Sequence, residues 1–377
     1  MSINAVVLKI ASRCNLNCSY CYMYHHADQS YKQQPKIMCE TVYRSAMQTM
    51  LKHSISQGIE HQIALIMHGG EPTLVGIKRF RWFAQTAKKI LGNRLMLLSI
   101  QTNGLLLTPE WVELFIEFNI IVSISLDGTP EVNDAFRIDH QGKGSHHKTV
   151  EGIRILQQGG ITPRIICVVN PTASGLTTYQ HFRQLGISKL DFLFPDTTHD
   201  SKPQFYDHYG KTPIADFLIE AFDAWMAEDN ANVKIRIFYN LLRSFMGAPP
   251  GSDAFGNPMV NYLIVNTDGA IEGMDALRVC DEGLVETGLN VQTDDFDDLA
   301  KSNSLLHQTA SQVINLADKC QSCAQVEICG GGHFPHRYSQ KNGFNNPSAW
   351  CHDIQKLFQH MRARIDNHIP EQTPVEA

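Results

Sequence analysis

The sequence predicts an α/β protein: a partial barrel of six strand–helix units, followed by a loop-rich C-terminal domain that carries cysteines. Three observations lead to this prediction. Strand-like apolar runs alternate with helical patterns through about the first 195 residues, which favours a parallel sheet. Glycine-rich and polar motifs recur where these strands end, and α/β sheets place their sites there. Most of the ten cysteines fall into two tight groups.

The strands and helices follow one another in a regular order. Strands are predicted at residues 4–11, 63–67, 95–100, 120–124 and 164–169, with a sixth ending near Phe194. Helices are predicted at residues 40–56, 77–91 and 148–158, with one more before the sixth strand. A further helix opens with Thr108 as N-cap and Pro109 as its first residue. Six units are too few for an eight-fold barrel, so we expect a partial (β/α)6 TIM barrel.

The second half of the chain has a different pattern. Residues 205–246 are predicted to form bridging helices, and Pro249-Pro250-Gly251 breaks the chain. A hairpin with an Asp-Gly turn at Asp268-Gly269 precedes a short loop-rich segment. We therefore divide the chain into a barrel at 1–204, bridging helices at 205–260 and a C-terminal domain at 261–365.

Composition excludes several classes of protein. Of the 377 residues, 43% are hydrophobic and 19% charged, with a net charge of -6 and no long basic run, so nucleic-acid binding is not expected. No apolar segment reaches the ~18 residues of a membrane helix, and the N-terminus lacks a signal peptide. We expect a cytoplasmic protein without membrane contact. A reducing compartment disfavours disulfides, so the grouped cysteines indicate metal ligation.

The first cysteine group has the spacing Cys14-x₃-Cys18-x₂-Cys21, in the loop after the first strand. Three thiolates leave one metal position open for a small molecule, whereas four close the site. A cubane iron–sulfur cluster held by three cysteines has one free iron. A zinc loop with a remote fourth ligand is the alternative from spacing alone.

This pattern resembles the radical S-adenosylmethionine (SAM) superfamily, in which such a loop follows the first strand of a partial barrel. Further motifs match it in order, each at a strand end. The resemblance implies a cofactor site formed by these residues: Tyr20, Gly69, Gly70, Glu71, Gln101, Asn103, Ser125, Asp127, Arg137 and Val168. Glu71 and Arg137 suit the amino and carboxylate groups of SAM. The resemblance implies that the cluster reduces SAM and that the resulting radical removes a hydrogen atom from substrate.

The second cysteine group, Cys320-x₂-Cys323-x₅-Cys329 with Cys351, resembles the SPASM domain of peptide-modifying radical SAM enzymes. Four thiolates close a cubane, and a zinc site is the alternative from spacing alone. The full SPASM pattern holds two auxiliary clusters, but Met274 and His333 stand where it has cysteines. We therefore expect two [4Fe–4S] clusters in all: one that binds SAM and one auxiliary cluster.

Several residues outside the two cysteine groups have predicted roles of their own. Asp275 directly follows Met274, where sulfatase-maturing SPASM enzymes carry an aspartate base, so it is a candidate catalytic base; a turn residue is the alternative. Cys280 is interpreted as a free thiol, and Cys39 and Cys167 as packing residues. His333 and His336 are interpreted as structural residues of a loop.

The glycine-rich tail from Cys329 to Cys351 resembles the cyclophane-forming peptide maturases. These radical SAM/SPASM enzymes join an aromatic ring to the β-carbon of a residue two positions on, in a ribosomally made precursor peptide. The resemblance implies a precursor peptide and a reductant such as flavodoxin or ferredoxin as partners. It also implies that the auxiliary cluster accepts an electron. A thioether-forming or sulfatase-activating maturase and a non-enzymatic iron–sulfur electron carrier or sensor are the alternatives.

Overall fold

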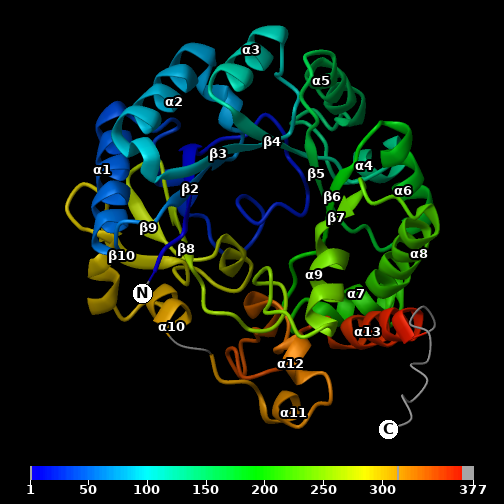
Figure 1. Cartoon of the computed structure of the whole chain (residues 1–377). Coiled ribbons are helices and arrows are strands. Elements are labelled where there is room, and N and C mark those ends of the chain that lie inside the picture. The colour runs from blue at the N-terminus through cyan, green and yellow to red at the C-terminus, as the bar shows by residue number, and fades with distance from the viewer. Residues whose placement is uncertain (1, 312–313, 367–377) are drawn as a thin grey trace, which may run out of the picture.

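One continuous sheet of ten strands organises the molecule. The computed structural model describes residues 2–311 and 314–366, and the sheet runs β10-β9-β8-β1-β2-β3-β4-β5-β6-β7. Its strands are β1 Ala5–Ala11, β2 Ile63–Gly69, β3 Leu95–Thr102, β4 Ile120–Ser125, β5 Arg164–Val168, β6 Lys189–Leu193, β7 Lys234–Ile235, β8 Tyr262–Val265, β9 Ala270–Glu272 and β10 Glu286–Asn290. Strands β1 to β6 pair in parallel and in chain order, which confirms the predicted partial barrel (Figure 1).

Helices cover the outside of this curved sheet (Figure 1). The helices of the described residues are α1 Glu40–Ser56, α2 Ile77–Leu91, α3 Pro109–Glu117, α4 Pro130–Asp134, α5 His146–Gln158, α6 Gly175–Gln184, α7 Lys202–Tyr209, α8 Pro213–Glu228, α9 Arg236–Phe245, α10 Leu305–Ser311, α11 Asp318–Gln321, α12 Val326–Cys329 and α13 Cys351–Asp366. Of these, α1, α2, α3, α5, α6 and α8 lie outside the sheet. Apolar side chains of the strands and helices form one core. Tyr43 of α1 stacks on Phe83 of α2, with 4.3 Å between ring centroids, so neighbouring helices also pack on each other.

The C-terminal hairpin belongs to the barrel sheet. Strand β8 pairs in parallel with β1, β9 pairs antiparallel with β8, and β10 pairs antiparallel with β9. The predicted Asp-Gly turn is present, with Gly269 at φ 90°. Pairing with β8 satisfies the backbone groups of β1 that an open barrel leaves at its edge. The division at residue 261 remains a prediction, but the sheet crosses it; residues 312–313 of that predicted domain lie outside the described residues.

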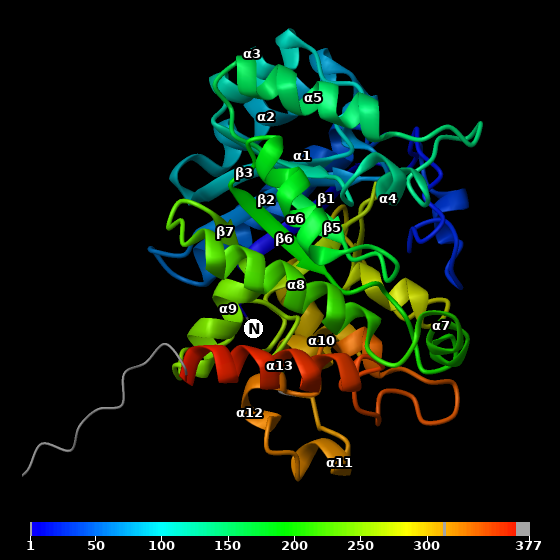
Figure 2. The same cartoon turned by 90° about the vertical axis from the view of Figure 1, so that its right-hand side faces the viewer.

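Helix α13 fastens the C-terminal region to the barrel. It runs alongside α8 beneath the barrel, with α11 and α12 below it (Figure 2). Asp353 is fully buried and accepts hydrogen bonds from the backbone N–H groups of Ile214 and Ala215, each at 2.9 Å. These N–H groups belong to the first turn of α8 and have no partner within the helix. Tyr206 of α7 donates to the same carboxylate at 3.0 Å.

One local prediction is confirmed and another is wrong. Thr108 is the N-cap of α3 and Pro109 its first residue, as predicted, and the Thr108 hydroxyl donates to the Glu110 carboxylate. Cys39 is exposed at the N-cap of α1, so it is not a packing residue, whereas Cys167 is fully buried in β5 as predicted.

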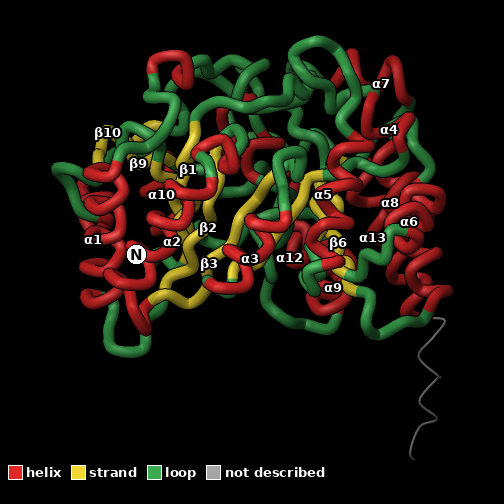
Figure 3. Tube along the Cα trace, turned by 90° about the horizontal axis from the view of Figure 1, so that it is seen from above, coloured by secondary structure: helices red, strands yellow, loops and turns green. Residues whose placement is uncertain are grey.

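The long loops gather along one edge of the molecule, where strands end (Figure 3). Among the described helices, none has the length and apolar character needed to cross a membrane.

Replacing Asp353 with Ala should destabilise the protein by about 3 kcal/mol, because three hydrogen bonds to one buried carboxylate disappear. Urea unfolding followed by circular dichroism measures the change. Asp353→Asn keeps one carbonyl acceptor and should lose less. A loss below about 1 kcal/mol for the Ala variant contradicts the anchoring role of this carboxylate.

Candidate functional site

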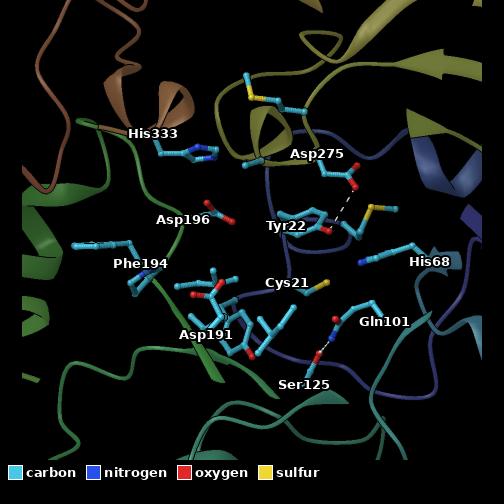
Figure 4. A pocket seen from close by; sticks show the side chains of 18 of the residues that line it. Cys21, Tyr22, His68, Gln101, Ser125, Asp191, Phe194, Asp196, Asp275 and His333 are labelled. Atoms are coloured by element: carbon cyan, nitrogen blue, oxygen red, sulfur yellow. Dashed lines mark hydrogen bonds between the residues drawn. The ribbon is translucent and has the colours of Figure 1, made fainter. Parts of the chain in front are cut away.

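A cavity of about 480 Å³ lies inside the barrel and reaches the loops that follow its strands (Figure 4). Every residue predicted for the first cofactor site lines it, together with the candidate base. These are Cys14, Cys18, Tyr20, Cys21, Gly69, Gly70, Glu71, Gln101, Asn103, Ser125, Asp127, Arg137, Val168 and Asp275. The residues come from the last positions of β2 to β5, from the loops after β1 to β4 and from the segment after β9, so folding alone brings them together.

The cysteine loop and the glycine turn after β2 are held in close contact. Gly70 N–H donates to the carbonyl of Ala11 at 2.8 Å, and Glu71 N–H donates to that of Arg13 at 2.9 Å. A Cβ atom on Gly70 would lie 2.4 Å from the Arg13 oxygen. A glycine is therefore required for the two loops to approach this closely.

The three thiols of the loop fit an iron–sulfur cluster. All three line the cavity, and the backbone N–H of Leu16 donates to the Cys14 sulfur at 3.3 Å. Burial raises the pKa of Cys14 to about 12 and that of Cys21 to about 11. Buried thiolates therefore need a cationic group to hold them in that form. Within the described residues, no three His, Cys, Asp or Glu side chains converge as closely as one metal ion requires.

Glu71 joins the ends of β2 and β3. Its buried carboxylate accepts from the Thr73 and Thr102 hydroxyls, each at 2.6 Å, and from the backbone N–H of Thr73 at 3.0 Å. Its second oxygen accepts from the Asn103 N–H at 2.8 Å and retains acceptor capacity. Burial raises the pKa of Glu71, and these donors oppose that effect.

Asp127, Tyr20 and Arg137 form a chain across the cavity wall. Tyr20 donates to Asp127 at 2.5 Å and accepts from Arg137 at 2.8 Å. The backbone N–H of Val168 donates to Asp127 at 3.0 Å. The buried Nε of Arg137 has no hydrogen-bond partner among the described residues. An unsatisfied guanidinium N–H in a cavity fits the carboxylate of a bound amino acid group. Nearby, Gln101 donates to Ser125 at 2.8 Å.

The opposite wall contains charged groups that sequence reasoning missed. Lys9 of β1 is fully buried and forms an ion pair with Asp275. Tyr22 donates to the other oxygen of Asp275 at 3.5 Å (Figure 4). Arg278 lies 3.4 Å from the first oxygen. Burial acts to raise the pKa of Asp275, but Lys9 and Arg278 outweigh it and hold that pKa below its usual value. Asp275 is therefore a carboxylate at neutral pH.

His68, His333 and His336 also line the cavity. His68 is the Cα partner of Lys9 across β1 and β2, so both side chains lie on the inner face of the sheet. His336 is buried and bonds Asp196 at 3.1 Å, and burial lowers its pKa. The interpretation of His333 and His336 as structural residues stays a prediction, and the structure adds that both line the cavity. In the sequence, the sign of this position was the pair of histidines beside the cysteine motif.

The second cysteine group forms a separate cavity of about 40 Å³. Cys320, Cys323, Cys329 and Cys351 all line it. Burial raises the pKa of Cys329 to about 11, and the N–H groups of Gly331 and Gly332 oppose this effect. Arg337 is buried beside this cavity, and its Nε and Nη1 have no hydrogen-bond partner among the described residues. Four thiols and an unpaired buried cation fit an anionic cubane cluster.

The model of the radical SAM superfamily matches residues 8–185. The protein has a radical SAM domain. It is therefore an enzyme, and domains of this type use SAM with a [4Fe–4S] cluster. The matched range contains every cavity residue of the predicted SAM site, whereas Asp275 and the second cysteine group lie beyond it.

Relatives extend the similarity to nearly the whole chain. The cysteine-type anaerobic sulfatase-maturating enzyme of Clostridium novyi (strain NT) is 28% identical over 365 residues, 95% of each chain. Native anSMEcpe with bound AdoMet and Cp18Cys peptide superposes with a TM-score of 0.82 at 23% identity, covering 97% of this chain and 98% of that one. Streptococcus suis SuiB bound to its precursor peptide SuiA gives 0.65 at 15% identity, covering 93% and 76%. The two structures show that the fold extends beyond the radical SAM domain.

The two cavities predict separable iron sites. Anaerobic reconstitution should give about eight irons per chain, and replacing Cys14, Cys18 and Cys21 with Ala should leave about half of them. SAM cleavage should be abolished in that variant. Cys39→Ala is the matched control, because Cys39 is exposed and lines neither cavity. About twelve irons in the wild-type enzyme would contradict a single auxiliary cluster.

Proposed function

We propose that the protein is a radical SAM peptide maturase that joins an aromatic side chain to the β-carbon of a residue two positions on. The observation that carries this proposal is the lining of the barrel cavity outside the predicted SAM site. That part of the lining is rich in aromatic rings and includes Asp275. The aromatic residues are Tyr22, Phe192, Phe194, Phe255, Tyr262 and Trp350.

These rings form a surface suited to an aromatic substrate. Phe194 lies 6.1 Å from Phe255 and 6.2 Å from Trp350 between ring centroids. A further ring binds well among aromatic side chains in edge-to-face or offset geometry. Asp275 is reached from the same cavity, so a proton released from a bound ring has an acceptor nearby.

The chemistry assigns distinct tasks to the residues of the chain. When bound, SAM and the first cluster supply the radical that removes a hydrogen atom from the substrate β-carbon. The carbon–carbon bond then forms, and a proton and an electron must leave the ring to restore aromaticity. Asp275 takes the proton. Cys320, Cys323, Cys329 and Cys351 would hold an iron–sulfur group, which would supply an acceptor for the electron. The net change is a loss of two hydrogens.

The sulfatase-maturing reaction is the second candidate, and one observation favours it. The sulfatase-maturating relative from Clostridium novyi aligns with 95% of this chain. In that reaction the same Asp275 would deprotonate a cysteine or serine side chain. Met274 supports the crosslinking reaction instead, because this buried thioether lines the cavity at the position of an auxiliary-cluster cysteine.

With its cognate peptide, the enzyme should cause a loss of two hydrogens per crosslink. Tandem mass spectrometry should place the bond between an aromatic ring and a β-carbon two residues away. Cys329→Ala should still cleave SAM but form no crosslink. Serine oxidation also removes two hydrogens, so the product is treated with hydroxylamine, which captures an aldehyde. A captured aldehyde or a sulfur-containing link would exclude the crosslinking reaction.

Asp275→Asn should slow crosslinking by about 10²–10⁴-fold, because the variant cannot accept the ring proton. Deoxyadenosine should still form, and liquid chromatography separates the two products. Equal rates of crosslinking in variant and wild type would remove Asp275 from the mechanism.

Lys9→Met should move the pH–rate profile of crosslinking to higher pH. Without the Lys9 ammonium, burial raises the pKa of Asp275, and a base acts only in its deprotonated form. Lys52→Met is the matched control, since Lys52 forms an exposed ion pair with Asp295 outside the cavity. An unshifted profile for Lys9→Met would show that the ion pair does not set the protonation of Asp275.

A further inference from the structure

Arg337 occupies an unusual position behind the four-cysteine cavity. It ends the 3₁₀ turn Phe334–Arg337, and only 2% of its surface is exposed. Its Nη2 donates to the carbonyls of Gly330 at 2.5 Å and Gly332 at 2.9 Å, and to Asn257 Oδ1 at 3.0 Å. These contacts use one of its three nitrogens. Its Nε and Nη1 are buried without a hydrogen-bond partner in the described residues.

No carboxylate within the described residues forms an ion pair with Arg337. One face of the guanidinium lies 5.8 Å from the centroid of the Phe334 ring, an attractive but weak contact. The groups whose negative charge, once they are deprotonated, would act on it are the thiols of Cys320 and Cys329. Gly331, which lines the cavity, lies directly against it: a Cβ there would be 3.0 Å from Arg337 Cζ.

A buried guanidinium without a counter-charge is costly, and proteins pair such groups. Two other buried cations of the described residues have acidic partners: Lys9 pairs with Asp275, and Arg278 pairs with Asp28 and Glu272. Four thiolates around a cubane carry net negative charge, and reduction adds one more unit of it. Such a group would supply the counter-charge that Arg337 lacks.

We propose that Arg337 is the counter-cation of the anionic iron–sulfur group held by Cys320, Cys323, Cys329 and Cys351, and that it stabilises the reduced form of this group. A nearby positive charge favours the state with the extra electron, so it raises the reduction potential. Arg337 is thus a positioning residue that makes the auxiliary group an electron acceptor. This inference rests on the proposed function of that group.

The test measures the midpoint potential of the auxiliary group alone. In a background with Cys14, Cys18 and Cys21 replaced by Ala, a redox titration followed by electron paramagnetic resonance reports only the second site. Arg337→Gln should lower the equilibrium constant for one-electron reduction of the auxiliary group at least tenfold. This change corresponds to a midpoint potential that is lower by about 59 mV. Arg337→Lys keeps the charge and should retain most of the potential. Lys319→Gln is the matched control, because Lys319 is an exposed cation at the same cavity, where water screens its charge.

Each outcome decides the proposal. An unchanged potential in Arg337→Gln with full iron content overturns it, as does an equal fall in Lys319→Gln. If Arg337→Gln loses its iron, Arg337→Lys decides: retained iron supports the counter-charge. Loss of iron in both variants shows that Arg337 acts only through its carbonyl contacts, which overturns the proposal. If the background protein itself holds no iron at the second site, the proposed function of that site fails before Arg337 is tested.

Discussion

The buried ion pair between Lys9 and Asp275 is the interaction on which the arrangement of the whole site depends. Lys9 lies on the inner face of the first barrel strand, where an unpaired ammonium would be strongly unfavourable. Its partner is supplied from far along the chain by the segment after β9. That segment reaches Lys9 because β8 pairs with the free side of β1. The barrel and the C-terminal region therefore complete one another, and neither contains a finished cavity alone.

The same strand also positions the SAM half of the site. The cysteine loop leaves the end of β1, and the glycine turn after β2 bonds to the carbonyls of Ala11 and Arg13. Any side chain on Gly69 or Gly70 would collide with this backbone. The position of the cluster loop is thus fixed by backbone contacts, while the polar chain through Tyr20 and Arg137 is fixed by side-chain hydrogen bonds.

The sequence predicted those features that depend on neighbouring residues. Strand–helix alternation, the two cysteine groups and the motifs at strand ends are local patterns, and they correctly placed the barrel and its cavity residues. It did not predict the pairing of β8 with β1, which joins segments about 250 residues apart. Lys9 was missed for the same reason, because a single lysine in an apolar strand gives no sign of its distant partner. Cys39 was misassigned because the residue type favours burial but the N-cap of α1 faces solvent.

The two cavities differ in how their charges are balanced, and this difference separates two kinds of chemistry. In the first cavity Asp191 has Arg236, Asp275 has Lys9, and Glu71 has four hydrogen-bond donors. Carboxylates held in this way keep defined protonation states, which suits a site that moves protons and orients substrate. Beside the second cavity, Arg337 has no carboxylate partner among the described residues, so its charge acts on whatever the thiols hold. A positive charge beside an anionic group favours the state in which that group has gained an electron. Both Asp275 and Arg337 come from the region after residue 260. Under the proposed function, the radical SAM domain would therefore prepare the reactive species, and the C-terminal region would determine where the proton and the electron go.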